Sequence, residues 1–272
     1  MLAIKNNLMA ANAARHLGMS YSALSKSVER LSSGLRINSA KDDAAGLAVR
    51  ELMRADIAVI KQGARNAQDG ISMLQTMEGA LSTIDDILVR MQALAEQAST
   101  GSYSSAQRYI MHQEFDELRQ EIDRIAQGTK FNGIKMLDNS STRSIQFGEL
   151  TTDKLDITGS VMTSASGGLG LTGLALDDTT SAKAALTTLD TAIGSKDTAR
   201  AKFGYKMNRL EGTVDVLSIQ AENLMSAESR VSDVDVAKEM AQLTRNQVLA
   251  QAGISMLAQA NTMPQMALTL LR

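Results

Sequence analysis

Apolar residues recur at alternating spacings of four and three through most of the chain, and this pattern predicts long helices that pack side by side. The first row runs Leu17, Tyr21, Leu24, Val28 and Leu31. Such spacing is typical of a coiled-coil seam. The segment that ends near Ser33 is therefore predicted to be one helix of about thirty residues, roughly 45 Å long.

The first row stops at a segment that we interpret as a joint between helices. Gly34 follows the row, and glycine is the usual left-handed cap after a helix. The stretch Ser39–Asp42 fits a capping box at the start of the next helix. Asp42 and Asp43 are interpreted as capping residues, because neighbouring helix residues do not face each other and helix N-termini favour negative charge. Arg36 and Lys41 are available for ion pairs with them or with a neighbouring subunit.

Two further helices are predicted between residues 47 and 128. The second of them starts at a capping box, Ser104–Gln107, and ends at Gly128. Three glycines, Gly63, Gly70 and Gly79, lie inside the first. Because each costs about 1 kcal/mol relative to alanine in a helix interior, we expect close backbone packing there.

The middle of the chain, residues 129–180, is rich in Gly, Ser, Thr and Asp. Asn132-Gly133 is a hairpin-type turn signal. Residues 144–147 and 154–157 are expected to pair as strands, and residues 160–173 read as an exposed loop.

Helix returns near Ser181, and a second joint follows at residues 229–235, with Ser232 and Asp235 in capping positions. The last helix carries two neighbouring apolar rows, which make a wide apolar stripe. The assembly seam is assigned to Leu17, Tyr21, Leu24, Val28, Leu31, Met240, Leu243, Ile254, Leu257, Met263 and Leu270.

The order of elements is nearly a mirror: terminal helix, joint, long helices, polar middle, long helix, joint, terminal helix. The predicted fold is mostly α, an elongated antiparallel helical bundle or coiled coil formed by the N- and C-terminal regions, with a small β-hairpin in the middle. One row faces the partner helix and the second stays exposed, which marks an association surface. Copies would form a homo-oligomer, or an open helical filament if the contact does not close.

Composition narrows the function classes. Aromatic residues are only 3% with no Trp, which favours a thin architecture, and we interpret the sixteen Met as adaptable core residues. The net charge is −2 without a Lys/Arg block, so no nucleic-acid partner is expected. We expect no membrane span and no Sec-type signal peptide. The absence of Cys excludes disulfides.

No motif for catalysis or for cofactor binding is present. The phosphate-binding, dinucleotide-binding and H-E-x-x-H patterns are missing, and His16 and His112 lie in different predicted helices without ligand spacing. We therefore expect no catalytic residue, no cofactor and no metal site, and we predict that the protein is not an enzyme.

Long stretches at both ends resemble bacterial flagellins. They are RLSSGLRINSAKDDAAGLAV from Arg30, NRLEGTVDVLSIQAENLMSAESRVSDVDVAKEM from Asn208, and LAQAGISMLAQANTMPQMALTLLR at the end. The resemblance implies a structural subunit of the extracellular flagellar filament, a helical homopolymer used for motility. It also implies secretion through the flagellar type III export apparatus with an export chaperone, and contacts with filament cap and hook-junction proteins. The terminal arms would fold on assembly.

The resemblance further implies a division of the chain. Residues 1–33 and 233–272 would form an inner coiled-coil domain, residues 34–46 and 226–232 the connectors, residues 47–128 and 181–225 an outer rod, and residues 129–180 a hairpin cap. The joint would comprise Gly34, Arg36, Ser39, Asp42, Asp43, Ser232 and Asp235.

Family members also carry a surface recognised by a host Toll-like receptor, and the matching positions here are Arg90, Leu94 and Glu114. A solvated helix face is the alternative for these three. For the whole chain the alternatives are a hook–filament junction protein and a non-filamentous coiled-coil adaptor.

Overall fold

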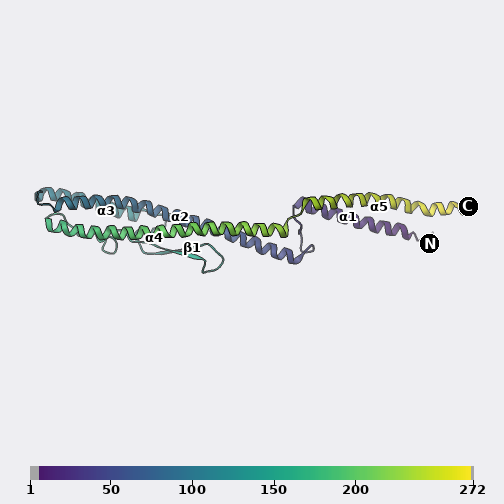
Figure 1. Cartoon of the computed structure of the whole chain (residues 1–272), viewed down its shortest axis with the longest axis horizontal. Helices are drawn as coiled ribbons and strands as arrows, with labels where there is room; N and C mark the ends of the chain where they lie inside the picture. The colour runs from purple at the N-terminus through teal and green to yellow at the C-terminus, as the bar shows by residue number, and fades with distance from the viewer. Residues whose placement is uncertain (1–5, 271–272) are drawn as a thin grey trace. The chain divides into compact units, whose positions relative to one another are not determined.

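The computed structural model describes residues 6–270, apart from the side chains of residues 264–265 and 267–270. Within that range the chain is mostly helical, as predicted (Figure 1). The helices are α1 (Leu8–Ser33), α2 (Ala44–Ser99), α3 (Ser105–Gly128), α4 (Thr179–Ser232) and α5 (Val236–Leu270). Strands β1 (Thr142–Gln146) and β2 (Lys154–Thr158) follow α3 and precede α4 along the chain, and they form a small antiparallel sheet.

The chain divides into two compact units. A terminal unit combines the N-terminal part up to Ala55 with the C-terminal part from Asn223, and a central unit spans Asp56–Glu222. Helices α2 and α4 contribute to both units, because each crosses a unit boundary within its length.

In the terminal unit, α1 and α5 lie side by side and antiparallel (Figure 1). At one end Asn7 caps α1 by accepting from the Ala10 N–H, and its amide also donates to the Ala260 carbonyl of α5, 2.7 Å away. At the other end Arg30 pairs with Glu239 over 3.7 Å. The two terminal regions therefore pack together as the heptad rows predicted.

The residues that make the α1–α5 seam differ in part from the prediction. Leu17, Leu24, Leu31, Leu243, Leu257 and Met263 are half-buried in the pair. Tyr21, Val28, Met240 and Ile254 are 46–50% exposed, so they do not lie in the contact between α1 and α5 of one chain, and their part in an assembly seam stays a prediction. Small and polar residues occupy the alternate seam positions instead: Ser20, Ser27, Asn246, Ala250, Gly253 and Ala260. The side chain of Leu270 lies outside the described residues.

The physical reason is the close approach of the two helices. A Cβ atom built on Gly253 would lie 3.1 Å from Cδ1 of Leu17, so the Leu17 layer already fills the space beside the α5 backbone. Small residues at alternate positions allow this approach, and the larger apolar residues are displaced to the flanks of the pair.

The central unit is built on α2, α3 and α4, whose apolar rows form one core. Its fully buried side chains include Leu74, Leu81, Leu88, Phe115, Ile122, Phe203 and Leu210. The capping box at the start of α3 is confirmed, because Ser104 and Gln107 hydrogen-bond to each other's backbone N–H groups. One buried cation, Lys196, joins α4 to α2 through Asp85 at 2.5 Å.

The polar middle segment folds onto this core. The turn at Asn132-Gly133 is confirmed, with φ of 47° and 78° and a bridge between Phe131 and Ile134. The predicted strand pair is confirmed as β1–β2, in which Ser144 lies opposite Asp156.

The expectation of an exposed loop at residues 160–173 is wrong in part. Met162, Leu169 and Leu171 are at most 4% exposed and belong to the core. Ser164 is anchored to α3, since its N–H and hydroxyl both donate to the Asp123 carboxylate, at 2.7 and 2.6 Å. The Gly- and Ser-rich composition concealed apolar residues that this loop contributes to the core.

The three glycines inside α2 do not share one role. A Cβ at Gly63 would lie 2.1 Å from the Phe147 carbonyl oxygen, and one at Gly70 would lie 3.2 Å from Ile145 and Leu210. These two glycines admit the close packing that we expected. Gly79 has no neighbour within 4 Å, so the expectation is wrong there.

Candidate functional site

In the joint of the terminal unit, the segment that connects α1 to α2 pairs with the segment that connects α4 to α5. Gly34 adopts φ of 72° and caps α1 through its N–H to the Arg30 carbonyl. The chain then pairs with the segment after α4: Arg36 N–H donates to the Ser232 carbonyl at 2.7 Å, and Val234 N–H donates to the Gly34 carbonyl at 3.0 Å. The left-handed glycine turns the chain out of α1 and into this bridge.

Asp43, and not Ser39, caps helix α2. The Asp43 carboxylate accepts from the Gly46 N–H at 2.9 Å, and α2 begins at Ala44. The capping box predicted at Ser39–Asp42 is therefore wrong, because these residues form a turn in front of the helix. A capping carboxylate must stand directly before the first helical residue, and of the two adjacent aspartates only Asp43 does so.

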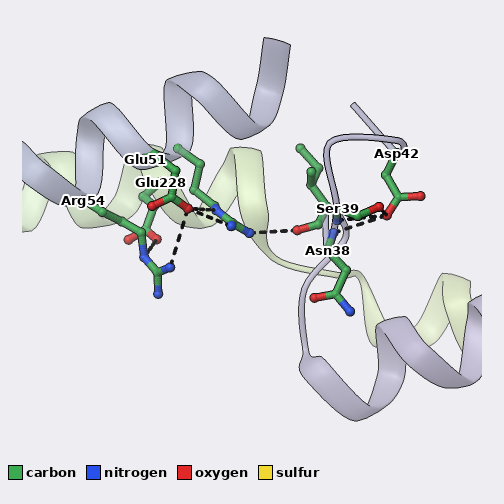
Figure 2. Close-up of polar contacts among 8 residues, drawn as sticks. Asn38, Ser39, Asp42, Glu51, Arg54 and Glu228 are labelled. Carbon is green, nitrogen blue, oxygen red and sulfur yellow. Dashed lines mark hydrogen bonds and ion pairs between the residues drawn. The ribbon is translucent and has the colours of Figure 1, made fainter. Parts of the chain in front are cut away.

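Asp42 organises that turn and connects it to α1. Its carboxylate accepts from the N–H groups of Asn38 and Ser39, each at 3.3 Å, and Figure 2 shows it facing both. Lys26 of α1 lies 2.6 Å from the same carboxylate. The Lys26 hydrogen bond, helped by the two backbone N–H groups, lowers the pKa of Asp42 from 3.8 to about 2. The sequence pointed to Asp42, but its partner Lys26 was missed.

Three arginines, Arg36 before α2 and Arg50 and Arg54 within it, make further contacts in the joint. The Arg36 guanidinium donates to the Val231 carbonyl at 2.6 Å, and not to the aspartates, which were one of the two partners expected for it. Arg50 is buried and donates to the Ile37 carbonyl at 2.8 Å. Arg54 lies 3.1 Å from Glu228 of α4, beside Glu51 (Figure 2). Sequence reasoning missed Arg50 and Arg54, because a backbone carbonyl or a partner far along the chain has no local signal.

The second connection is shorter than predicted. Helix α4 continues to Ser232, so only Asp233, Val234 and Asp235 separate it from α5. Asp235 caps α5 as expected, because its carboxylate accepts from the Lys238 N–H at 3.1 Å. Ser232 does not cap a helix, because its buried hydroxyl has no hydrogen-bond partner. Its carbonyl accepts the hydrogen bond from the Arg36 N–H.

The α1–α5 pair exposes much of its apolar surface. The large apolar side chains that are at least 46% exposed on these two helices are Leu8, Met9, Met19, Tyr21, Val28, Val236, Met240, Val248, Leu249, Ile254, Met256 and Met266. On α5 they lie on the faces that α1 does not cover. No Asp, Glu, Lys or Arg occurs between Asn246 and Leu270, so no charge interrupts the surface along that part of α5.

Two adjoining grooves run along one face of the pair. The first, of about 390 Å³, is lined mainly by Met9, Ala13, Met256, Ala260 and Met263. The second, of about 420 Å³, includes Met19, Ala23 and Leu249. Both are lined by His16 and Gly253, so they form one continuous depression. An apolar depression of this kind accepts apolar side chains of another helix.

The receptor positions implied by the resemblance lie on the central unit. Arg90 of α2 and Glu114 of α3 are exposed and form an ion pair of 2.6 Å. Leu94 is 3% exposed and belongs to the helix core. Of the three, only the ion pair reaches the surface. None of the helices in the described range is long and apolar enough to cross a membrane.

Comparison with known proteins decides what these features belong to. Residues 4–142 match the bacterial flagellin N-terminal helical region, and residues 186–271 match the bacterial flagellin C-terminal helical region. The chain belongs to the bacterial flagellin family. It is 42% identical over 270 residues to the flagellin of Halalkalibacterium halodurans, and the alignment covers 99% of each chain. It is 43% identical over 284 residues to the flagellar filament 33 kDa core protein of Treponema phagedenis, again over 99% of each.

Among solved structures, a flagellar hook-associated protein from Vibrio parahaemolyticus has a TM-score of 0.60 and 14% identity, over 71% of this chain and 100% of that one. At that identity the likeness shows the fold alone, and it does not favour a hook–filament junction role. The flagellin relatives match the chain over nearly its whole length, so it is a structural subunit of the extracellular flagellar filament and assembles with copies of itself.

Proposed function

We propose that the terminal unit is the part of this flagellin that drives polymerisation, and that neighbouring copies cover the exposed faces of α1 and α5. The observation that carries the proposal is the distribution of apolar residues on α5. Large apolar side chains that are exposed over such an extent normally mark a surface on which another molecule packs. Within one chain, α1 covers only one face of α5, so the other faces are available to pack against other molecules.

The missing charges support a contact between like copies. A self-complementary surface brings equal charges together, and unpaired buried charges are strongly unfavourable. Because α5 has no charged residue from Asn246 to Leu270, its flanks can be covered by another α5 or α1 without that cost. An open, non-closing contact of this kind produces a helical filament.

The joint has a positioning role in this proposal. Its bridge between Leu35 and Asp233, the Lys26–Asp42 pair and the Arg54–Glu228 pair tie α1 and α5 to the ends of α2 and α4 within the terminal unit. A fixed joint presents the apolar pair in one orientation in each copy, which a regular helical array requires. The division into an inner domain, connectors, rod and cap stays a prediction.

Other expectations belong to the same proposal. Export through the type III apparatus without a Sec signal, an export chaperone, and contacts with cap and hook-junction proteins follow from family membership alone. An isolated α1 or α5 cannot offset its ordering entropy without a partner, which supports arms that fold fully only on assembly. Recognition by a Toll-like receptor through Arg90 and Glu114 is tested by the loss of receptor binding in Arg90→Ala.

A charge placed on the exposed face of α5 tests the proposal. Val248 is 58% exposed, so Val248→Glu should leave the monomer's helix content unchanged. Because an unpaired carboxylate is costly to bury, elongation from filament seeds should fall by about a hundredfold or more. The matched variant Val248→Ala, which stays apolar, should elongate close to the wild-type rate.

A second variant removes α5 altogether. A chain without residues 233–272 should keep the core of α2, α3 and α4, because none of its members lies in the deleted part. It should not polymerise. Normal elongation of either Val248→Glu or the truncated chain would contradict the proposal.

A further inference from the structure

Methionine is distributed unevenly between the two units. Among the described side chains, the methionines that are at least 39% exposed are Met9, Met19, Met225, Met240, Met256 and Met266, and all belong to the terminal unit. Those that are at most 3% exposed are Met73, Met77, Met91, Met136 and Met162, and all belong to the central unit. The interpretation of methionine as core filler therefore holds for the central unit only.

Four methionines line one surface of the terminal unit. Met9, Met256 and Met263 line the first groove between α1 and α5, and Met19 lines the second, which continues it. The neighbouring residues are mostly Ala, Gly and Leu, and the pair carries no thiol that could react first, since the chain has no Cys. The thioethers are therefore the most oxidisable groups on this face.

We propose that these four groove methionines, Met9, Met19, Met256 and Met263, are a site of reversible oxidation that switches off assembly. The inference rests on the proposed function, because oxidation matters only if other copies cover the groove. The oxidant is a two-electron peroxide. The sulfur lone pair attacks one peroxide oxygen, and an S–O bond forms as the O–O bond breaks, which gives a protonated sulfoxide and hydroxide. The hydroxide takes the proton of the new S–OH group and becomes water, and the neutral sulfoxide remains. Sulfur loses two electrons and the peroxide gains them.

The product opposes assembly for a physical reason. A sulfoxide is a strong hydrogen-bond acceptor with a large dipole, whereas the thioether that it replaces is apolar. The donors in the groove are the side chains of Asn12, His16, Ser20, Asn246 and Gln259, and the rest of its lining is Ala, Gly, Leu and Met. An apolar helix that covers the groove removes water from the sulfoxide and adds no donor of its own. Each sulfoxide that none of these side chains reaches then lowers association by about tenfold.

The same geometry makes the sensitivity depend on the state of the protein. In the free chain the groove is open, and all four thioethers can be reached. In a filament whose copies cover the groove, the thioethers are shielded. The switch therefore acts on subunits before they are incorporated and spares those already assembled.

The test begins with site-resolved chemistry on the full-length chain. Monomer is treated with hydrogen peroxide, and sulfoxide at each methionine is measured by peptide mass spectrometry. The groove methionines should oxidise at least about ten times faster than buried Met77, Met91 and Met136. Equal rates in the two groups would overturn the inference, whatever the assembly behaviour of the protein.

The second measurement is elongation from unoxidised filament seeds. Oxidised wild-type monomer should elongate at least about tenfold more slowly, and methionine sulfoxide reductases with a dithiol should restore the rate. The variant Met9→Leu/Met19→Leu/Met256→Leu/Met263→Leu keeps apolar residues of similar size and should elongate normally after peroxide. The control Met111→Leu/Met207→Leu, altered in the central unit, should remain peroxide-sensitive.

The outcomes separate this inference from the function on which it rests. Unchanged elongation of wild-type monomer that carries sulfoxide at all four positions overturns the switch. So does equal peroxide sensitivity of the fourfold Leu variant. If untreated wild-type monomer fails to elongate on seeds, the proposed function is at fault, and the oxidation rates alone then decide whether the groove is a modification site. If the fourfold variant does not assemble, recovery of the wild type by the reductases decides the question.

Discussion

Two glycines in the same helix are predicted to respond in opposite ways to the same substitution. Gly63 and Gly79 both lie inside α2, and both are in the central unit. At Gly63 an alanine Cβ would meet the Phe147 carbonyl oxygen at 2.1 Å, whereas at Gly79 it would meet nothing within 4 Å. The segment at Phe147 is also fixed to α2 by Asn66, whose amide donates to the Gln146 carbonyl at 2.9 Å.

The magnitude follows from two opposing effects. Replacing glycine by alanine in a helix interior stabilises the helix by about 1 kcal/mol, and this gain is common to both sites. Only Gly63→Ala forces backbone atoms apart, and overpacking of that kind costs about 1–3 kcal/mol. The free energies of unfolding of the two variants should therefore differ by about 1–3 kcal/mol, with Gly79→Ala above the wild type. In a unit of this size that difference corresponds to roughly 2–12 °C in Tm.

Thermal unfolding of the full-length monomer, followed by far-ultraviolet circular dichroism, measures this difference. Gly79→Ala should melt above the wild type and Gly63→Ala well below Gly79→Ala. If Gly63→Ala melts at or above Gly79→Ala, the strand end does not pack against α2 as described, and the explanation of this glycine is wrong.

Three further predictions concern charged residues. Asp85→Asn should lower the free energy of unfolding by about 1–3 kcal/mol in urea titrations, because it removes one of two carboxylates that neutralise buried Lys196; an unchanged value would show that the pair contributes nothing. Asp43→Ala should lower the free energy of unfolding by about 1 kcal/mol, whereas Ser39→Ala should lower it by less than about 0.5 kcal/mol, because only Asp43 caps α2. A larger loss for Ser39→Ala than for Asp43→Ala would show that Ser39 is the cap after all. Asp42 should titrate near pH 2 by carboxyl NMR. Because its folded pKa lies below the unfolded 3.8, the stability linked to it should be fully present above pH 3.8 and lost as the pH falls toward 2; a midpoint at or above 3.8 would contradict the ion pair.

The helices and turns were predictable because their signals are local. Apolar spacing located every helix, Ser104 and Gln107 marked the start of α3, and Asn132-Gly133 marked a turn that needs positive φ. Each of these signals depends on residues within a few positions of one another. The same holds for Gly34 at the end of α1 and for Asp235 at the start of α5.

The predictions failed where the decisive partner is distant or is not apolar. Ser27 lies in the α1–α5 seam because small residues admit a close helix approach, and a search for large apolar residues cannot detect that. Arg50 binds the Ile37 carbonyl, an acceptor that any residue could provide. Whether Ser39 or Asp43 caps α2 depends on where the turn at residues 39–42 ends and the helix begins. In each case the geometry is set by tertiary packing.

The measurement that tests the central claim most directly is a helical reconstruction of the native filament by electron cryomicroscopy. The account predicts that Met240, Val248, Leu249 and Met256 of each subunit are buried against α1 and α5 of neighbouring subunits. A filament in which these side chains face solvent, with subunits joined only through their central units, would contradict it.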